Sequence, residues 1–406
     1  MNNVRKVCDD LYWVGANDHR TALFENIFPI PRGVSYNSYV LLDEKTAVFD
    51  SVDWNYGNEY LHNVEETLAG RPLDYIIVNH MEPDHCASVG LMHQAHPEAT
   101  IVSTEQAFQM MDQFQFDFGD AKKQVVNEFD TLSLGKHNLL FVYAPMVHWP
   151  EVMMTFDTTN GVLFSADAFG TFGALDGVLF NDEVNFERDW LPDARRYLTN
   201  IVGKYGPQVQ AILAKAGTID IKMLCPLHGP VWRSNLGWFI DKYDKWSKYE
   251  PEEKGVMIAY ASMYGHTAYT AQVLASLLHE RGVHNVAVYD VSNTHMSQLV
   301  SETFRLSHVV LASVTYNLGI YPIMHNYLMD LAALNVQNRT FALIENGTWA
   351  AKSGDLMEEL LNTQCKTMDI MSDRVTVNSA LNEGNRSDME ALADALAEDI
   401  LGKKSK

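Results

Sequence analysis

Cysteine is scarce in this chain of 406 residues, and the few that occur are far apart. No two of them form a Cys-x-x-Cys pair, so the sequence indicates neither a disulfide framework nor a sulfur-ligated iron or zinc site. Free cysteines are commonly buried small apolar residues, and that is the state expected here. The four cysteines are Cys8, Cys86, Cys225 and Cys365.

Positive charge and long apolar runs are also lacking. The formal net charge is -22, so the clustered cations that bind nucleic acid or an anionic membrane are scarce. No apolar run approaches the roughly 18 residues of a membrane span, and residues 1–5 contain no signal-peptide core. We therefore expect a cytoplasmic protein with no nucleic-acid partner and no membrane partner.

The overall composition is that of an ordinary globular protein, with 47% hydrophobic and 20% charged residues. A chain of 406 residues exceeds the size of a single hydrophobic core, so two domains are expected. The charged, proline-bearing segment 250–254 has the composition of a linker. We place the first domain at residues 1–250, the second at 255–402, and a disordered tail at 403–406.

Short strands and turns alternate in the first half of the chain, which predicts a sheet-first architecture. Helices are expected at residues 59–68, with Asn58 as the N-cap, at 89–96 and at 105–114. The pair Asn160-Gly161 predicts a hairpin between two strands. The strands are expected at residues 11–14, 39–42, 47–50, 73–78, 101–103, 139–144, 152–156, 162–165 and 223–225.

The segment from residue 79 to residue 85 holds two imidazoles and two carboxylates, directly after the strand at 73–78. A strand that ends in such a group projects it from the edge of the sheet. Mixed nitrogen and oxygen donors suit borderline and hard cations, whereas soft metals prefer sulfur. A solvated polar loop is the alternative, but donors this crowded predict a metal site. The donors are His80, Glu82, Asp84 and His85.

Three more candidate ligands follow strands: His148, Asp167 and His228, the last beside a glycine. Each alone is more often an ordinary hydrogen-bonded residue. Together with the first segment they give four imidazoles and three carboxylates, which are too many for one tetrahedral ion. Because a carboxylate can bridge, we expect two metals about 3.5 Å apart.

The second half of the chain alternates strands with helices, which predicts a parallel sheet whose ligand lies at the carboxyl ends of the strands. Strands are expected at residues 256–260, 309–312 and 341–344, and a helix at 268–281. The segment 262–267 joins the first strand to this helix, a geometry that binds phosphate through backbone N–H groups and the helix dipole. It matches neither a P-loop nor a dinucleotide turn, and a plain strand-to-helix turn is the alternative.

Two later loops, at residues 313–317 and 345–349, open at the same edge of the sheet and strengthen the prediction of a cofactor site. Tyr316 and Trp349 are candidates to cover the two faces of a flat ring, although aromatic residues in loops more often simply pack. The candidate cofactor-binding residues are Ser262, Met263, Tyr264, Gly265, His266, Thr267, Ser313, Val314, Thr315, Tyr316, Asn317, Asn346, Gly347, Thr348 and Trp349.

The segment from His80 to His85 resembles the His-x-His-x-Asp-His signature of the metallo-β-lactamase superfamily, with Glu82 where the hydrolases carry a second histidine. With the later ligands in order and a flavodoxin-like pattern behind them, the chain resembles the flavodiiron proteins (A-type flavoproteins) over nearly its whole length. The resemblance includes the segments 36–39 (Tyr-Asn-Ser-Tyr) and 148–151 (His-Trp-Pro-Glu). It implies an α/β fold, with an N-terminal metallo-β-lactamase-like αββα sandwich and a C-terminal flavodoxin-like doubly wound parallel sheet.

The same resemblance implies ligands, cofactors and an activity. One iron is bound by His80, Glu82 and His148, the other by Asp84, His85 and His228, and Asp167 bridges them. A glutamate in place of a histidine adds a hard anionic donor, which suits redox-active iron better than hydrolytic zinc. The implied cofactors are two non-haem irons and FMN, and the implied activity is reduction of O2 to water or of NO to N2O.

Partners and lining residues also follow from the resemblance. It implies a head-to-tail homodimer or a dimer of dimers, and an external electron donor such as rubredoxin. Because the chain has no Cys-x-x-Cys pair, it resembles the minimal two-domain class without a fused rubredoxin. Tyr197 is a candidate to hydrogen-bond the diatomic substrate, with a plain surface or core tyrosine as the alternative. His19 and Glu25 are further candidates for the lining of the pocket.

Three other functions are open from the sequence. The main alternative is a dinuclear zinc hydrolase of the metallo-β-lactamase superfamily with a flavodoxin-like accessory domain. A pure electron carrier fits less well, because all seven ligand positions are filled, and an NADH-driven enzyme lacks its dinucleotide turn. The sequence does not rank O2 against NO, because both need the same open metal positions.

Overall fold

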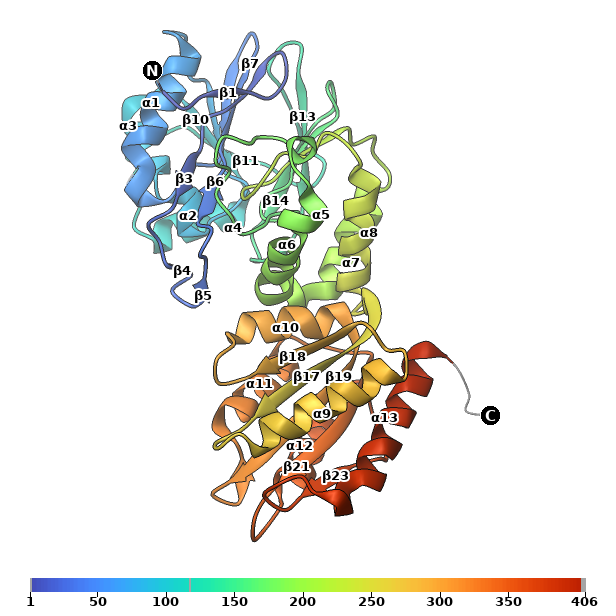
Figure 1. Ribbon diagram of the computed structural model, residues 1–406. Coiled ribbons are helices and arrows are strands. Elements are labelled where there is room, and N and C mark those ends of the chain that lie inside the picture. The colour runs from blue at the N-terminus through green and yellow to red at the C-terminus, as the bar shows by residue number, and fades with distance from the viewer. Residues whose placement is uncertain (1, 117, 403–406) are drawn as a thin grey trace. The chain divides into compact units, whose positions relative to one another are not determined.

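The computed structural model describes residues 2–116 and 118–402 (Figure 1). The chain forms two compact units, which divide between Tyr243 and Asp244. This division falls inside helix α8 (Leu236–Ser247), a few residues before the charged segment 250–254. Each unit has its own sheets and its own buried residues.

The first sheet of the N-terminal unit runs in the spatial order β1-β2-β7-β8-β9-β10-β11. The pairs from β1 to β8 are antiparallel, and those from β8 to β11 are parallel. All parallel strands of this sheet therefore end at one edge. The strands are β1 (Arg5–Lys6), β2 (Leu11–Trp13), β7 (Tyr39–Leu42), β8 (Thr46–Phe49), β9 (Tyr75–Ile77), β10 (Thr100–Ser103) and β11 (Lys123–Val125).

The second sheet runs in the order β12-β13-β14-β15-β16 and is antiparallel except for the pair β15 and β16. Gly161 turns the chain between β14 and β15 at φ +71°, so the predicted Asn160-Gly161 hairpin is confirmed. The strands are β12 (Thr131–Ser133), β13 (Asn138–Tyr143), β14 (Met153–Asp157), β15 (Val162–Phe164) and β16 (Met223–Cys225).

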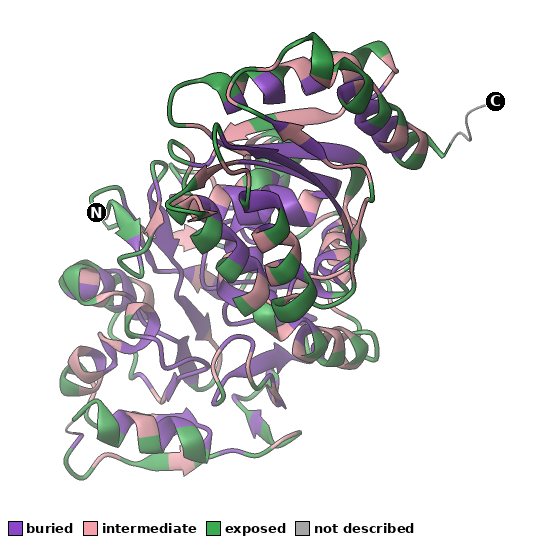
Figure 2. Ribbon diagram, turned by 90° about the horizontal axis from the view of Figure 1, so that it is seen from below, coloured by how far each residue is buried: buried purple, intermediate pink, exposed green. Residues whose placement is uncertain are grey.

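Helices cover the outer side of each sheet, with α1 and α3 outside the first and α7 and α8 outside the second, which gives αββα layers (Figure 1). The strands are largely buried and the outer faces of the helices are exposed (Figure 2). The helices are α1 (Gly57–Leu68), α2 (Pro83–Cys86), α3 (Val89–Ala95), α4 (Glu105–Gln113), α5 (Phe186–Asp189), α6 (Leu191–Tyr197) and α7 (Gly206–Ala216). Two short ribbons pair β3 (Ala16–Asp18) with β6 (Val34–Tyr36), and β4 (Leu23–Phe24) with β5 (Phe28–Pro29).

Helix α1 corrects one predicted cap. A 3-10 turn at Trp54–Tyr56, whose N-cap Asp53 accepts from a backbone N–H, continues directly into the helix at Gly57. Asn58 therefore lies inside the helix, and the N-cap is Tyr56. A residue with good capping chemistry does not cap when the preceding turn already winds into the helix.

The C-terminal unit is built on one parallel sheet in the order β18-β17-β19-β21-β22, with β23 also paired to β21. Numbered within the unit, this is the strand order 2-1-3-4-5 of a doubly wound sheet. The topological switch point lies between β17 and β19. The strands are β17 (Glu253–Ala261), β18 (Val286–Asp290), β19 (Leu306–Tyr316), β20 (Gly319–Ile320), β21 (Arg339–Asn346), β22 (Met368–Ile370) and β23 (Val375–Val377).

Both faces of this parallel sheet are buried, as helices on both sides require. Val256 and Ile258 of β17 face the core formed with α9 and α13, while Met257 and Ala259 point to the opposite face and are also buried. The helices are α9 (His266–Glu280), α10 (Met296–Arg305), α11 (Pro322–Ala333), α12 (Ser353–Gln364) and α13 (Arg386–Leu401).

Two strands continue beyond their predicted ends. Strand β19 reaches Tyr316 and then pairs with β20, so residues 313–316 are strand and not the loop that the sequence predicted. Strand β21 likewise includes Glu345 and Asn346. The apolar runs marked only the buried part of each strand, and the polar residues beyond keep the ladder, with Ser313 paired to Glu345.

Two further predictions concern the C-terminal tail and membrane-spanning segments. The predicted tail at 403–406 lies outside the described residues. Among the helices of residues 2–116 and 118–402, none is both long and apolar enough to cross a lipid bilayer.

Candidate metal centre

A buried carboxylate holds the segment that follows β9. Asn79 donates its backbone N–H to Asp50 Oδ1 and its side-chain amide to Asp50 Oδ2, each at 2.7 Å, and the His80 N–H lies 3.2 Å from Oδ1. Burial raises the pKa of Asp50 to about 6, although the bonds from Asn79 lower it. This network fixes the direction in which His80 leaves the sheet.

The short helix α2 brings in two more donors. Its N-cap is Glu82, and Pro83 occupies the first position, where its missing N–H costs no hydrogen bond. Asp84 and His85 follow within the same turn. Four donors thus leave one strand end in a compact arrangement.

Strand register brings Asp167 and His228 together. In the parallel pair of β15 and β16, Phe164 lies opposite Cys225, and each candidate ligand comes three residues later. The pairing continues past the strands, because Ser165 N–H donates to the carbonyl oxygen of Cys225 at 3.2 Å. Two residues that are far apart in the chain therefore reach the same point at the edge of the sheet.

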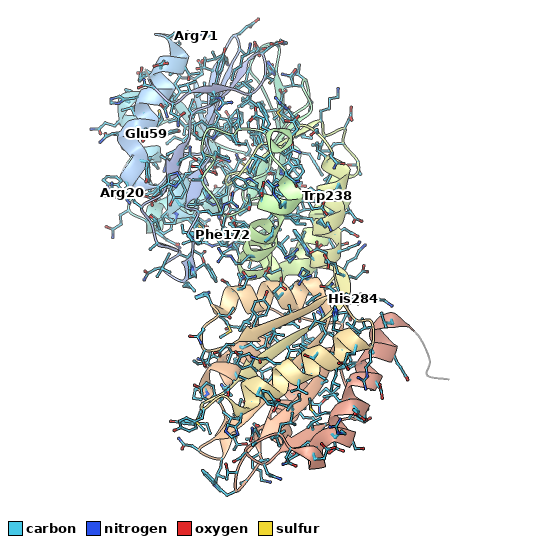
Figure 3. The ribbon with its side chains drawn as sticks, in the orientation of Figure 1. Arg20, Glu59, Arg71, Phe172, Trp238 and His284 are labelled. Carbon is cyan, nitrogen blue, oxygen red and sulfur yellow. The ribbon has the colours of Figure 1, made fainter. Side chains whose placement is uncertain are left out.

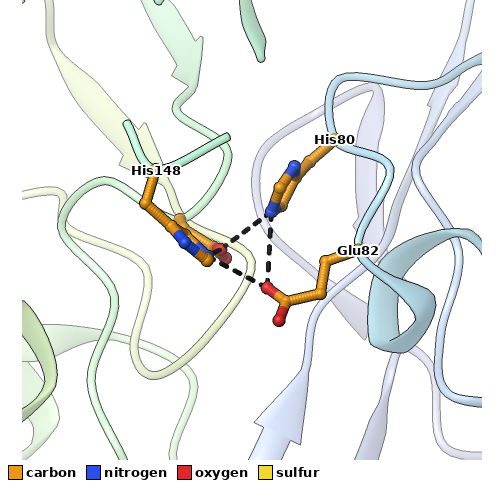
Figure 4. A group of neighbouring side chains, drawn as sticks. His80, Glu82 and His148 are labelled. Atoms are coloured by element: carbon orange, nitrogen blue, oxygen red, sulfur yellow. Dashed lines mark hydrogen bonds and ion pairs between the residues drawn. The ribbon is translucent and has the colours of Figure 1, made fainter. Parts of the chain in front are cut away.

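The first group contains His80, Glu82 and His148, which turn toward one another (Figure 4). His148 Nε2 lies 3.0 Å from Glu82 Oε2, and His80 Nε2 lies 3.4 Å from the same oxygen. Asp167 Oδ2 completes the group at 3.3 Å from His80 Nε2 and 3.2 Å from His148 Nε2. All four side chains are buried.

The second group contains Asp84, His85 and His228. His85 Nε2 and His228 Nε2 lie 3.0 Å apart, and Asp84 Oδ2 lies 3.4 and 3.3 Å from them. Asp167 Oδ1 lies 3.2 Å from His85 Nε2 and 3.6 Å from His228 Nε2. The structure therefore gathers all seven predicted ligands, and Asp167 presents one oxygen to each group.

These residues fit two metal ions. Within the described residues, His80 Nε2 and both carboxylate oxygens of Asp84 and Asp167 are buried without a hydrogen-bond partner. Buried polar atoms are nearly always paired, so their convergence calls for a cation. The 3.0 Å between His85 Nε2 and His228 Nε2 also suits two ligands with metal–nitrogen bonds of about 2.0–2.1 Å. A donor set of imidazoles and carboxylates suits iron.

The imidazoles and carboxylates of the cluster stabilise one another in their charged forms. Burial would lower the pKa of His80, but the Asp167 carboxylate leads the neighbours that hold it well above its usual value. Bonds to Asp167 and Glu82 likewise outweigh burial and raise the pKa of His148 to about 9. Burial would raise the pKa of Asp167, yet the charges of His85 and His80 hold it well below its usual value. A metal that binds here therefore displaces protons from the imidazoles.

Two acceptors behind the ligands were missed by the sequence prediction. Glu151 Oε1 lies 2.9 Å from His80 Nδ1 and accepts from the Met81 N–H at 2.8 Å. The carbonyl oxygen of Ser35 lies 2.7 Å from His228 Nδ1. Glu151 stands three residues after a predicted ligand, which was a usable signal, whereas a backbone carbonyl leaves no trace in a sequence.

A cavity of about 290 Å³ opens beside the metal centre, lined among others by Phe24, Glu25 and Asp84. Glu25, a candidate from the sequence, thus lines the pocket, and burial together with the charge of Glu82 raises its pKa to about 8. His19 does not line this cavity, and its Nε2 lies 2.9 Å from an Asp176 oxygen.

Tyr197 ends helix α6 and is buried in the core. Its ring centroid lies 5.4 Å from that of His228, and Phe172, labelled in Figure 3, meets it edge-on at 5.1 Å. Within the described residues its hydroxyl has no hydrogen-bond partner. Burial, followed by the charge of Asp167, raises the pKa of Tyr197 well above its usual value, so the hydroxyl stays protonated.

In the C-terminal unit, the candidate cofactor residues gather at the carboxyl ends of β17, β19 and β21. Gly265 precedes α9 at φ +94°, and apart from its chain neighbours no atom of the described residues lies within 4 Å of a Cβ built there. Ser262 Oγ accepts from the Gly265 N–H at 3.1 Å. An open backbone at the start of a 15-residue helix fits a phosphate group.

Side chains tie these segments together. Asn346 donates to Thr267 Oγ1 at 3.3 Å, which joins the third segment to the first. Ser379, which the sequence prediction missed, accepts from the Asn346 amide through its carbonyl oxygen at 2.9 Å, and its hydroxyl lies 2.6 Å from that of Thr348. Ser379 follows β23, so a polar residue after one more short strand was the available signal.

The three aromatic candidates of this site are open to solvent. Tyr264 and Trp349 are each 89% exposed, and Tyr316 is 41% exposed. A flat ring bound between the loops would bury apolar surface that the chain itself leaves uncovered. Stacking of Tyr316 and Trp349 on such a ring stays a prediction.

Comparisons with known proteins agree on one family. A family model described as "ODP family beta lactamase" matches residues 34–229. The nitric oxide reductase of Moorella thermoacetica is 30% identical over 364 residues, which cover 89% of this chain and 90% of that protein. The rubredoxin oxygen:oxidoreductase from Desulfovibrio gigas superposes with a TM-score of 0.90 at 28% identity, over 99% of both chains. The chain belongs to the flavodiiron protein family.

A further solved structure, the flavodiiron protein from Giardia intestinalis, has a TM-score of 0.89 at 26% identity and covers 99% of this chain and 98% of its own. The predicted fold class is therefore confirmed: this flavodiiron protein combines a metallo-β-lactamase-like αββα sandwich with a flavodoxin-like doubly wound sheet. FMN and two non-haem irons are the cofactors that the family implies, and the residues of both sites fit them.

Proposed function

We propose that this flavodiiron protein reduces a diatomic substrate, O2 to water or NO to N2O, with electrons delivered through FMN. The observation that carries the proposal is the placement of Asp167, whose two oxygens face two separate groups of ligands. Relatives named nitric oxide reductase and rubredoxin oxygen:oxidoreductase support the reaction class. When bound, the irons would offer neighbouring coordination positions and the flavin would supply single electrons.

The proposed ligand assignment follows the two groups. His80, Glu82 and His148 hold one iron, Asp84, His85 and His228 hold the other, and Asp167 bridges them. His80 and His228 direct Nδ1 outward to oxygen acceptors, so each presents the lone pair of Nε2 to its metal. Three carboxylates offset much of the charge of two ferrous ions.

The surroundings of the second group suit a small neutral substrate. The ring centroid of Phe24 lies 5.3 Å from that of His228 and 5.4 Å from that of Phe172. These apolar rings pack beside His228, and Tyr197, whose ring also lies beside His228 and whose hydroxyl stays protonated, is our candidate donor to a diatomic substrate. The relatives named nitric oxide reductase and rubredoxin oxygen:oxidoreductase do not favour the zinc hydrolase alternative.

The proposal extends to the electron path. The segment 262–267 holds the FMN phosphate through its backbone, and Tyr316 and Trp349 cover the flavin ring. An external donor of the rubredoxin type would reduce the flavin, in line with the name of the Desulfovibrio gigas protein. A head-to-tail homodimer brings the flavin of one copy to the irons of the other. Residues 1–250 and 255–402 serve as the diiron and FMN domains.

Anaerobically purified protein tests this function. We expect two irons and one FMN per chain, and oxidation of the FMN-reduced protein by O2, by NO, or by both in separate assays. The relative rates rank the two substrates. Two zincs without iron, or a reduced protein that is inert to both gases, would contradict the proposal.

A further inference from the structure

The two ligand groups are supported from behind by different kinds of acceptor. His80 Nδ1 donates to the Glu151 carboxylate at 2.9 Å, whereas His228 Nδ1 donates to the carbonyl oxygen of Ser35 at 2.7 Å. Both bonds select the tautomer that turns Nε2 toward the cluster. The second imidazole of the second group, His85, has a buried Nδ1 without a partner in the described residues. Of these acceptors, only Glu151 adds a negative charge.

The two hydrogen bonds that Glu151 accepts do not require a negative charge. Its side chain is fully buried, and its Oε1 accepts both N–H groups, from His80 and Met81. Its Oε2 has no hydrogen-bond partner within residues 2–116 and 118–402. The oxygen of a neutral amide would accept the same two donors, so a buried anion here needs compensation from a cation. That compensation has to come through the His80 ring, which lies between Glu151 and the other side chains of the cluster.

The candidate ligands of the two groups are matched in charge. Glu82 belongs to the first group, Asp84 to the second, and Asp167 is shared. Each group also contains two imidazoles. Glu151 bonds directly to the outer nitrogen of a candidate ligand, and an imidazole that donates to a carboxylate becomes a more basic metal ligand than one that donates to a carbonyl.

We propose that Glu151 is a positioning residue that strengthens His80 as a ligand, so that the His80 group holds its metal more tightly than the His228 group does. This inference rests on the proposed function for the identity of the site, but it concerns metal binding and not turnover. Changes to such supporting acceptors typically alter metal affinity by about 10–100-fold.

The test replaces Glu151 by glutamine, which keeps the size and one acceptor oxygen but removes the charge. Metal-free protein is titrated anaerobically with ferrous iron, and the iron-57 form is examined by Mössbauer spectroscopy. The wild type is expected to fill in two steps. In E151Q the tighter step weakens by about 10–100-fold, the weaker step is unchanged, and one of two iron signals shifts.

A matched control separates charge at the metal from loss of a buried pair. Asp157 is also a buried carboxylate, lies 2.8 Å from His137 Nδ1 in the same unit, and bonds to none of the candidate metal ligands within the described residues. Asp157→Asn is expected to bind both irons as the wild type does. Glu151→Asp, which keeps the charge, is expected to recover part of the affinity lost in Glu151→Gln and covers the case in which glutamine impairs folding.

The outcomes distinguish the two ideas. A wild type that binds fewer than two irons contradicts the proposed function. If the wild type binds two, then unchanged binding steps and unchanged iron signals in E151Q overturn the role of Glu151. Equal weakening in E151Q, Glu151→Asp and Asp157→Asn also overturns it, because that pattern reports a loosened fold.

Discussion

The two units of this flavodiiron protein prepare their sites in opposite ways. In the N-terminal unit, the side chains of His80, Asp167 and His228 are 0% exposed and are braced by neighbouring groups. In the C-terminal unit, Tyr264 and Trp349 are 89% exposed. The metal site is therefore built by the protein in advance, whereas the flavin site leaves surface for its ligand to cover.

The difference follows from what each ligand contributes. A metal ion offers no surface of its own and needs donors placed within tenths of an ångström, so the chain anchors them at strand ends. A flavin brings a large flat ring and a phosphate, so it supplies much of the burial itself. Exposed loops around an open backbone are sufficient to receive it.

The sharpest test of this contrast is Asp167→Ala. Because one side chain faces both groups, we expect iron content to fall from two per chain to one or none. FMN content should stay at the wild-type level, since its residues lie in the other unit. Metal analysis and flavin absorbance measure the two separately.

If Asp167→Ala retains both irons, Asp167 is not the bridge. If it loses FMN together with iron, the two sites are coupled and the comparison between self-sufficient units fails.

Removal of FMN should destabilise one unit alone. A ligand at 100 times its dissociation constant adds about 2.7 kcal/mol to the stability of the unit that binds it. In calorimetry, the transition of the C-terminal unit should move to lower temperature without FMN, while that of the metal-loaded unit stays in place. Chelation of iron should move the transition of the N-terminal unit to lower temperature and leave that of the FMN-loaded unit in place. A single transition that moves in both experiments would contradict independent sites.

Two glycines, one in each unit, allow the packing of the two sites to be compared directly. Gly229 and Gly265 both have left-handed φ, +79° and +94°, but a Cβ on Gly229 would lie 2.1 Å from Thr171 Cγ2 whereas one on Gly265 meets open space. Backbone strain costs about 1–3 kcal/mol in each alanine variant. Gly229→Ala adds a clash beside His228, so it should lose more stability in urea denaturation and also lose metal.

Gly265→Ala should lower the free energy of unfolding by an amount near the lower end of that range. Its main effect should be a weaker affinity for FMN. Equal loss of stability in the two variants would indicate that the flavin loop is as tightly packed as the metal centre.

The smallest expected effect is the pH-dependent stability that Asp18 contributes in the turn before the pocket. Asp18 accepts from Arg20 N–H at 2.7 Å and from the Thr21 hydroxyl at 2.6 Å. Burial would raise the pKa of Asp18, but the bonds from Thr21 and Arg20 hold it below its usual value. The unfolded chain therefore binds the proton more readily. The stabilisation is complete above the unfolded pKa and is lost as pH falls through the lower folded value.

Asp18→Asn should thus lower stability by about 1 kcal/mol near neutral pH, and by less at pH 3. Thermal melts at several pH values measure the difference. A loss that is the same at all pH values would show that the charge of Asp18 does not matter.

Much of this architecture was predictable because apolar runs mark strands and polar clusters mark their ends. The seven gathered side chains all follow strands or the turn after one, which is why spacing alone found them. The alternation of strands and helices after residue 255 likewise predicted a parallel sheet, which the strand pairing confirms. Local patterns succeed where function lies at the end of an element.

The remainder depended on contacts between distant segments. Glu151 reaches His80 across 71 positions, and Ser35 reaches His228 across 193, so no local pattern relates them. The end of β19 was misplaced because Ser313 and Thr315 look like loop residues, although their backbone pairs with neighbouring strands. Such pairing is decided by the sheet and not by the residue.

The parallel register of β15 and β16 has a consequence for how this family can change. The segment between the two strands carries Tyr197 and its helix, yet the register of Asp167 and His228 is set by the pairing of Phe164 with Cys225, and His228 Nδ1 bonds to Ser35, outside that segment. Length and composition of that segment can therefore drift while the metal-binding frame is inherited intact. Substrate preference can therefore change through the segment between β15 and β16 while the pairing of these two strands stays the same.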